Sequence, residues 1–250
     1  MRRILLWIFF IGIFFVGIRG GKQVVSTVTV LNPNVSKDLP IYSVETSKKV
    51  ISLTFDTAWG NEDMKEILSI LKRENVTATF FFSGEWVQKY PKDIKKIAKA
   101  GHDIGNHGDT HKHMTTLSKE NQKIEIIEAQ EKVKGITGET MELFRAPFGD
   151  YDASVVRNAR ELGYEVIQWD VDSLDWKEYG VNQMIDKVCH HKNLQNGSIL
   201  LLHTGTKYTK KALAKMIQNL KHQGYRFLPV SKLIYKENYY IDANGRQRQK

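Results

Sequence analysis

Cysteine is almost absent from this sequence, and that absence limits the chemistry the chain can carry. A single cysteine, Cys189, occurs among 250 residues. The chain therefore forms no internal disulfide and no zinc site built from several thiolates, so any metal must be held by histidine and carboxylate side chains. Internal repeats are also lacking. The length fits one catalytic-size domain with small additions at its ends.

No concentrated patch of positive charge accompanies the high net charge. The formal net charge is +9 and the sequence pI is about 9.4, but lysine and arginine residues are spread along the chain with acidic residues between them. A basic stripe interleaved with aromatic residues, typical of a nucleic-acid interface, is missing. We therefore expect no nucleic-acid partner, and the net charge favours loose association with an anionic matrix such as a bacterial wall.

The first hydrophobic run is short for a membrane span. Arg2 and Arg3 precede an apolar run over residues 4–18, which at about 1.5 Å per residue is shorter than the roughly 30 Å hydrocarbon core. Residues 1–21 are predicted to be a signal peptide or, since no Ala-x-Ala cleavage site follows, a retained membrane anchor. The leading arginines predict a cytoplasmic start and export of the rest. A buried helix of the folded domain is disfavoured because the run is apolar on all sides.

Short apolar runs alternate with amphipathic stretches from Val50 onward. The two patterns alternate seven times, which predicts an α/β domain with a parallel sheet over residues 49–235, either an open sheet or a closed barrel. Residues 22–48 contain the β-like run VVSTVTV and are predicted to be a linker or an added strand. Residues 236–250 are predicted to be a polar C-terminal tail.

Polar residues collect where the predicted strands end. In parallel α/β folds this is the face that carries active sites. A charge placed after a strand of Leu, Ile and Phe needs a partner, because desolvating it alone costs several kcal/mol. Five strand ends of this kind on one face argue against coincidence. They carry Asp56 and Thr57, His107 and His111, Arg145, Asp172 with Asp175 and Trp176, and His203.

His107 and His111 lie four residues apart in the stretch GNHGDTHKHM. The pair could cap a loop, or it could ligate zinc through imidazole nitrogens, and the spacing does not separate these readings. The stretch is not the HExxH motif of zinc proteases, because glycine follows the first histidine where that motif has its general-base glutamate.

Each of the other strand-end residues also has a structural interpretation. Asp56 could cap the next helix, although Asn61 is the better placed cap. Arg145 could be an ordinary ion-pair partner, and His203 a hydrogen-bonded histidine at a strand end. Trp176, like Phe148, could simply pack at the rim of the core. The ordered set points to an active site more strongly than any single residue does.

These strand-end motifs, in their order, resemble those of the polysaccharide deacetylases of carbohydrate esterase family four, the NodB-homology domain. TFDT at 54–57 is similar to the family's TFDD, and HGDTH at 107–111 to H-(S/T)-x-x-H. RAPFG, DSLDW and LLLH are similar to the third, fourth and fifth motifs. The match covers roughly residues 50–230. Within the family, the chain is most similar to the sporulation-associated PdaB group.

The resemblance implies a distorted (β/α) barrel, with seven strands expected, and hydrolysis of N-acetyl groups on an N-acetylated cell-wall glycan. Peptidoglycan or a chitin-like chain would be the substrate, in sporulation or cortex maturation. Matched by position, Asp56 is the expected catalytic base and Arg145 orients it. His107 and His111 are the expected metal ligands. Zinc is the expected metal, with cobalt, manganese or nickel as alternatives.

The last two motifs complete the implied machinery. His203 is expected to protonate the leaving amine, with Asp175 tuning it. Trp176, Phe148 and Pro147 are expected to border the sugar groove, and backbone N–H groups near Phe148 to help hold the oxyanion. Asp172 opens the fourth motif without an assigned role.

Two departures from the family pattern concern the metal. Thr57 stands where the family has its ligand aspartate, so two imidazoles and at best a neutral hydroxyl remain, and affinity for a divalent ion should fall. Gly108 replaces a hydroxyl residue that would fix a ligand's orientation. Asp109 could serve as a substitute third ligand if its side chain pointed the same way as both imidazoles.

Three functions are therefore open. The first is an exported, metal-assisted deacetylase of wall glycan. The second is a non-catalytic glycan-binding protein that has lost its metal because of Thr57. The third is hydrolysis of another acyl group, such as an O-acetyl ester. No obligate protein partner is inferred, and a membrane would be a partner only through an uncleaved N-terminal segment.

Overall fold

The structure is a computed structural model that describes residues 38–250. The predicted signal peptide or anchor at 1–21 lies outside the described residues. So does the run VVSTVTV, together with most of the predicted linker or added strand at 22–48.

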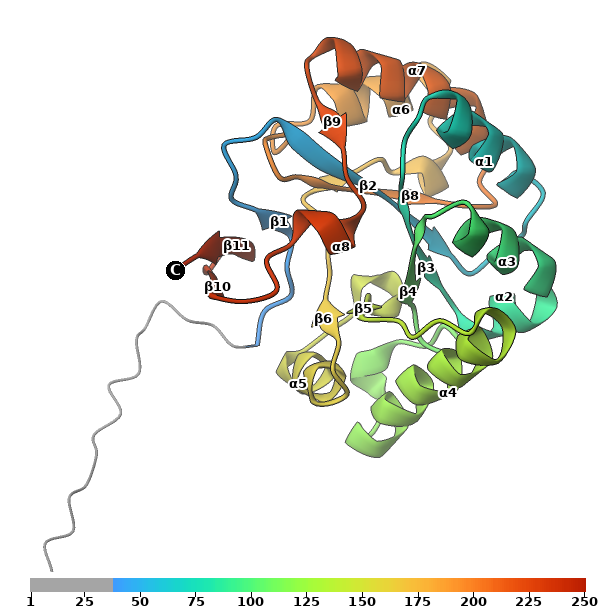
Figure 1. The fold of residues 1–250 in the computed structure, drawn as a ribbon, viewed down its shortest axis with the longest axis vertical. Coiled ribbons are helices and arrows are strands. Elements are labelled where there is room, and N and C mark those ends of the chain that lie inside the picture. Colours follow the sequence, from blue (N-terminus) through green and yellow to red (C-terminus); the bar gives the residue numbers. More distant parts are fainter. Residues whose placement is uncertain (1–37) are drawn as a thin grey trace, which may run out of the picture. The chain divides into compact units, whose positions relative to one another are not determined.

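A curled, all-parallel sheet forms the centre of the described part (Figure 1). Its strand order is β6-β5-β4-β3-β2-β8-β7, and short β9 pairs with the start of β2. The predicted α/β class with a parallel sheet is confirmed, and the sheet curls into a half-barrel. The strands are β2 (Val50–Thr57), β3 (Thr79–Phe82), β4 (Asp103–Asn106), β5 (Leu143–Phe144), β6 (Glu165–Val166), β7 (Val171–Asp172), β8 (Ile199–His203) and β9 (Arg226–Phe227).

The central strand β2 shows why one face of the sheet is apolar and the other is not. Successive side chains of a strand point to opposite faces. Leu53 and Phe55 pack into the main hydrophobic core under the helices. Thr54 and Asp56 alternate with them and lie on the enclosed face, where both are buried. The sequence of β2 thus places polar groups inside the curl of the sheet.

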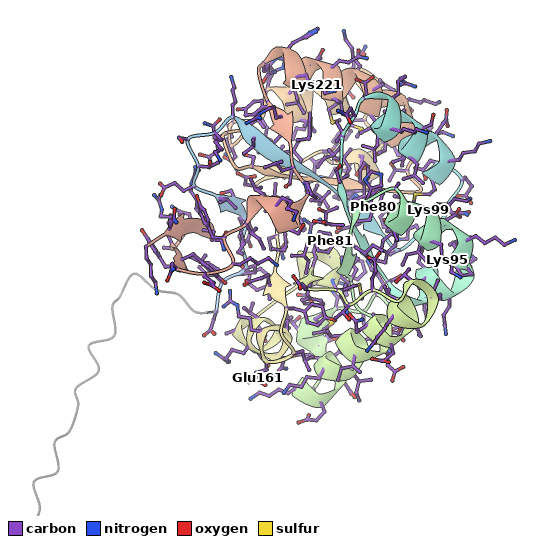
Figure 2. The ribbon with its side chains drawn as sticks, viewed as in Figure 1. Phe80, Phe81, Lys95, Lys99, Glu161 and Lys221 are labelled. Atoms are coloured by element: carbon purple, nitrogen blue, oxygen red, sulfur yellow. The ribbon has the colours of Figure 1, made fainter. Side chains whose placement is uncertain are left out.

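Amphipathic helices cover the outer face of the sheet. In α3, Ile94 and Ile97 are buried against the core, while Lys95 and Lys99 project outward from the same helix (Figure 2). The helices are α1 (Met64–Arg73), α2 (Gly84–Lys89), α3 (Pro91–Lys99), α4 (Lys119–Thr137), α5 (Ala153–Glu161), α6 (Val181–Cys189) and α7 (Thr209–His222).

The predicted cap of the first helix is wrong. The Asn61 side chain donates to the Asp93 carboxylate at 2.7 Å instead of capping a helix. Asp63 occupies the N-cap position of α1 and makes no side-chain cap there. Its carboxylate is used elsewhere, in the loop that follows β8.

The run YEVIQWDV at residues 164–171, one of the short apolar runs of the alternating pattern, does not form one strand but is divided between the two edges of the sheet. Its first part forms β6, which pairs with β5, and its last part forms β7, which pairs with β8. Residues 167–170 cross from one edge to the other. Beside this crossing, Ile41 donates to the Val166 carbonyl and accepts from Gln168 N–H, both at 2.8 Å. Because only four residues make the crossing, the two edges lie close together although β6 and β7 do not pair.

A small second sheet lies at the amino-terminal end of the parallel strands. It has the order β1-β11-β10, formed by β1 (Ser43–Val44), β10 (Tyr239–Ile241) and β11 (Arg246–Gln249). Ile241 and the short α8 (Val230–Leu233) join a second core cluster that includes Phe81 from inside the curl. Residues 236–250, predicted as a polar tail, thus contain two paired strands. They do so because Ile241 and Gln247 are buried against the barrel.

Among the helices of residues 38–250, none is both long and apolar enough to cross a membrane.

Candidate active site

A cavity of about 370 Å³ opens at the carboxyl ends of the parallel strands. Strand β2 ends beside β3 and β8, and the loop carrying His107 follows β4, so residues far apart in sequence meet at this edge. The cavity is lined by Asp56, Ala58, Trp59, His107, His111, Phe148, Trp169, Asp172, Trp176, Leu201 and His203. The structure therefore brings together Asp56, the histidine pair and His203, as the sequence predicted.

Asp56 is held by a buried arginine. Arg145 Nη1 donates to Asp56 Oδ1 at 2.7 Å and to Thr54 Oγ1 at 2.9 Å, and Nη2 donates to the Gln168 carbonyl at 3.1 Å. The guanidinium carbon lies 4.1 Å from the centre of the Phe81 ring. Burial by itself raises the pKa of Asp56, but the charge and hydrogen bond of Arg145, together with His107 and His203, outweigh burial and leave that pKa below its ordinary value. Asp56 is thus an ionised carboxylate at neutral pH.

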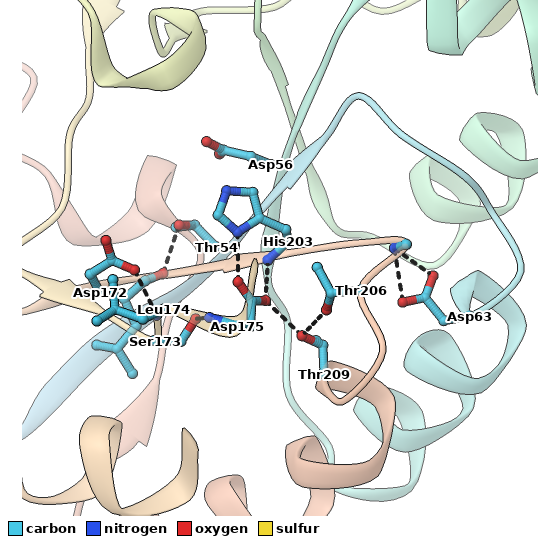
Figure 3. A network of polar contacts seen from close by, with 12 residues as sticks. Thr54, Asp56, Asp63, Asp172, Ser173, Leu174, Asp175, His203, Thr206 and Thr209 are labelled. Atoms are coloured by element: carbon cyan, nitrogen blue, oxygen red, sulfur yellow. Dashed lines mark hydrogen bonds and ion pairs between the residues drawn. The ribbon is translucent and has the colours of Figure 1, made fainter. Parts of the chain in front are cut away.

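His203 is paired with a carboxylate on its far side. Its Nδ1 lies 2.7 Å from Asp175 Oδ1, and its backbone N–H donates to Asp175 Oδ2 at 2.7 Å (Figure 3). A carboxylate accepts, so Nδ1 carries a proton and Nε2 is directed away from Asp175. Burial lowers the pKa of His203, but the hydrogen bond and charge of Asp175, with Asp56 and Asp172, leave it above the ordinary value.

The histidine pair lies on the opposite side of Asp56. His107 Nδ1 is 2.8 Å from the Arg145 carbonyl oxygen, which only accepts, so Nδ1 carries the proton and Nε2 keeps its lone pair. That Nε2 is 3.5 Å from Asp56 Oδ2. The ring of His111 is 5.0 Å from that of His107, centre to centre. Burial lowers the pKa of both, that of His111 to about 4, so both are neutral imidazoles near pH 7.

The loop that carries the two histidines is fixed by α4. Glu125 Oε2 accepts from the N–H groups of Asp109 and Thr110 at 2.9 and 2.7 Å, and Oε1 accepts from the Thr110 hydroxyl. Lys132, also on α4, binds both carboxylate oxygens of Asp109 at 2.6 and 2.7 Å. Asp109 is therefore an ion-pair partner of Lys132 in this structure and does not line the cavity.

Gly108 accounts for the shape of the same loop. Its φ is +72°, a left-handed backbone conformation that residues other than glycine rarely adopt. Its N–H donates to Asn106 Oδ1 at 2.9 Å. The departure from the family motif at this position thus supplies a turn.

The donor set does not fit a metal site with three protein ligands. Catalytic zinc normally has three, and the neutral imidazoles of His107 and His111 supply two. Within residues 38–250, no three His, Cys, Asp or Glu side chains are arranged to hold an ion. Thr57, the last residue of β2, is fully buried and does not line the cavity, and its hydroxyl has no partner in the described part of the chain.

Aromatic side chains form the rim of the cavity. Phe148, Trp176 and Trp59 are 55%, 51% and 45% exposed. Phe148 has φ +61°, a strained value for this residue type, and the preceding Pro147 is buried behind it. The predicted rim residues Phe148 and Trp176 are therefore at the cavity, whereas Pro147 is not among the residues that line it.

Sequence reasoning missed two of the aromatic residues at this cavity. Trp59 stacks on His203, with ring centres 5.2 Å apart, and Trp169 lines the cavity floor beside Arg145. Trp59 lies only three residues beyond Asp56 in a loop that follows a strand, and this proximity is the signal that could have found it. Asp172 also lines the cavity, and burial raises its pKa.

Comparison with known proteins places the chain in a family. Residues 43–167 match the family described as polysaccharide deacetylase. The peptidoglycan-N-acetylmuramic acid deacetylase PdaA of Bacillus subtilis is 34% identical over 215 residues, which cover 83% of this chain and 80% of that protein. A peptidoglycan-N-acetylglucosamine deacetylase of Bacillus cereus is 35% identical, covering 77% and 92%.

Solved structures agree with the sequence relatives. The wild-type BA3943 of Bacillus anthracis, described as a pseudoenzyme of carbohydrate esterase family four, is 32% identical with a TM-score of 0.76, covering 85% of this chain and 74% of that one. A mutant of BA3943 is described as having restored enzymatic activity. By sequence and by structure, the chain belongs to the polysaccharide deacetylase family.

Proposed function

We propose that the protein hydrolyses N-acetyl groups of a cell-wall glycan. The observation that carries the proposal is the placement of Asp56 and His203 at one cavity with opposite pKa shifts. The pKa of Asp56 is lowered, so near neutral pH its carboxylate is ionised and free to accept a proton, and that of His203 is raised, so its imidazole more readily holds a proton to donate. Pairs of titratable groups whose environments separate their pKa values mark acid and base roles.

In the proposed reaction, Asp56 accepts a proton from the attacking water while the water oxygen bonds to the acetyl carbon. Arg145 holds the carboxylate ionised and in one orientation through its 2.7 Å hydrogen bond. His203 Nε2 then donates a proton to the amide nitrogen as the carbon–nitrogen bond breaks. Acetate and a free amino sugar leave, and the Asp175 pairing keeps His203 in the required tautomer.

The substrate class is supported by the rim. Sugar rings present apolar C–H faces that pack on exposed aromatic side chains, and Trp59, Phe148 and Trp176 surround the cavity opening. The relatives PdaA and the Bacillus cereus enzyme are named for N-acetylmuramic acid and N-acetylglucosamine respectively. We infer an N-acetylated peptidoglycan chain as the substrate.

Export and metal binding are further parts of the proposal. Arg2 and Arg3 ahead of the apolar run support export across the membrane. A role in sporulation or cortex maturation is supported only by the resemblance to the PdaB group. The two neutral imidazoles of His107 and His111 would hold a divalent ion such as zinc only weakly, and no step of the proposed reaction depends on it.

Thr57 supports a second candidate, a glycan-binding protein without turnover. Beyond the two neutral imidazoles the donor set lacks a third ligand, and a family neighbour of similar fold is described as a pseudoenzyme. In this case the rim would bind sugar while the cavity released no acetate.

Acetate release from N-acetylated peptidoglycan fragments by the full-length protein separates the two candidates. It should be measured with a chelator and with added zinc, beside sugar binding by calorimetry and beside an O-acetyl ester substrate. Release of acetate from the amide supports the enzyme. Binding without release supports the second candidate, and release from the ester alone would point to a different acyl group. If the protein neither binds the sugar nor releases acetate, both proposals are overturned.

A further inference from the structure

Asp175 receives a hydrogen bond that the proposed reaction does not use. We propose that Thr209, supported by Thr206, is a positioning residue that locks the Asp175 carboxylate and through it the imidazole of His203. This inference rests on the proposed function only for its catalytic consequence, because the contacts themselves are independent of substrate.

The contacts form a short chain that reaches from α7 into the cavity (Figure 3). The Thr209 hydroxyl lies 2.6 Å from Asp175 Oδ2, and 2.6 Å from the Thr206 hydroxyl. A carboxylate only accepts, so Thr209 donates its single proton to Asp175. Thr206 must then donate to Thr209. The order is Thr206 to Thr209 to Asp175, with His203 donating to Asp175 from the other side.

Burial gives the Thr209 hydrogen bond its importance. The Asp175 side chain has no exposed surface, and Thr209 is also fully buried. A buried carboxylate depends on protein donors for the hydrogen bonds that water would otherwise supply. Among residues 38–250, Oδ1 has His203 Nδ1 as its one hydrogen-bond partner, while Oδ2 accepts from His203 N–H and from Thr209. Without Thr209, the carboxylate loses the one side-chain donor that opposes its rotation away from the imidazole.

The segment between β8 and α7 is also fixed at a second point. Both carboxylate oxygens of Asp63 accept from the Gly205 N–H, at 3.0 and 2.9 Å. This buried aspartate therefore holds the turn after His203, and Thr209 begins α7 three residues beyond Thr206. The two anchors place Thr206 and Thr209 where they can reach Asp175.

Several carboxylates from different elements surround His203, and Thr209 contacts one of them, that of Asp175. Asp56 on β2 and Asp172 on β7 also face the imidazole, and the neutral His107 and His111 lie across the cavity. Asp175 makes the direct hydrogen bond, so a change in its orientation alters His203 more than the distant carboxylates can.

The test is an NMR pH titration of His203 in the full-length protein. The His203 signal is assigned by its loss in His203→Asn, and wild type is compared with Thr209→Val, Thr209→Ser and Thr206→Val. Thr204→Val is the matched control, because Thr204 is an equally buried threonine of the same segment whose hydroxyl has no partner within residues 38–250. Valine keeps the shape of threonine and removes only the hydroxyl.

We expect the His203 titration to move to lower pH in Thr209→Val, and to move less but in the same direction in Thr206→Val. Thr209→Ser and Thr204→Val should titrate like wild type. With a substrate that the wild-type protein hydrolyses, Thr209→Val should lower kcat about tenfold with KM little changed. A tenfold loss corresponds to the energy of about one hydrogen bond to a charged group. An unmoved His203 titration in soluble Thr209→Val or Thr206→Val would overturn the inference. Because the titration needs no substrate, absence of acetate release would count against the proposed function alone.

Discussion

Asp56 and His203 are direct register partners on neighbouring parallel strands, β2 and β8. Residues paired across two strands point to the same face of a sheet, so the backbone itself brings the carboxylate and the imidazole to one cavity. Each has a buried partner behind it, Arg145 for Asp56 and Asp175 for His203. A base and an acid are thus held on rigid elements rather than on mobile loops.

Replacing either group should abolish acetate release. Asp56→Asn removes the base and His203→Ala removes the acid, and each loss should lower kcat roughly 100- to 10,000-fold. Acetate release is measured on a peptidoglycan fragment at saturating concentration. The exposed pair of Asp186 on α6 and His190, the residue that follows this helix, lies 2.7 Å apart and provides chemically matched controls. Asp186→Asn and His190→Ala should retain wild-type rates. Normal activity in both Asp56→Asn and His203→Ala would remove these residues from the mechanism.

The pH–rate profile should be broad and include neutral pH. Asp56 acts when ionised, so activity is lost only as pH falls through a pKa below the ordinary 3.8. His203 acts when protonated, so activity is lost as pH rises through a pKa above the ordinary 6.5. The profile of kcat/KM, extended well below pH 3.8 on the acid side and well above pH 6.5 on the alkaline side, measures both limbs.

Asp175→Asn should move one limb of that profile only. The variant removes the charge that raises the pKa of His203, and burial then lowers it. The alkaline limb should therefore shift to lower pH while the acid limb stays in place. A shift of the acid limb instead would mean that Asp175 acts on Asp56 rather than on His203.

The sequence predicted the parallel α/β class and the residues that meet at the cavity, because both follow from periodicity and strand ends. Asp56 and His203 each come at the end of an apolar run, and parallel strands align such ends at one edge. The alternation in VISLTFDT accounts for which side chains of β2 face inward in the structure.

Other features depend on tertiary contacts that periodicity does not encode. The run YEVIQWDV is divided because residues 167–170 must cross between sheet edges, which no local pattern reveals. Asp109 was an open candidate for the metal, and only the position of Lys132, 23 residues away on α4, shows its pairing. Trp59 was missed because an aromatic residue in a loop carries no periodic signal.

Trp59 should contribute to sugar binding and shield His203. Its ring stacks on the imidazole, and its 45% exposure leaves a face for substrate. Trp59→Ala should raise KM by up to about tenfold, given the energy of an aromatic contact, while Trp59→Phe should recover most of the loss. Initial rates over a range of glycan concentrations give the split between KM and kcat. Tyr179→Ala is the control, because Tyr179 is exposed but does not line the cavity. Equal effects of the two alanine variants would argue against a specific contact at Trp59.

Thr57→Asp should exchange stability for metal affinity. Without metal, a carboxylate at this fully buried position has no partner, and an uncompensated buried charge costs roughly 3–5 kcal/mol. With the imidazoles of His107 and His111, this carboxylate would complete the set of three metal ligands that the family motif implies. Thermal unfolding in chelator should therefore show a lower Tm than wild type.

Zinc should reverse that loss in Thr57→Asp alone. An ion present at 100 times its Kd adds about 2.7 kcal/mol to the folded state, so the Tm of this variant should rise with zinc, and its metal content should exceed that of wild type. Thr204→Asp is the matched control, since Thr204 is equally buried with an unpartnered hydroxyl in the described part of the chain. It should lose stability in chelator and gain none with zinc. Equal zinc stabilisation of wild type would show that the two histidines suffice, and would remove the basis of the non-catalytic candidate.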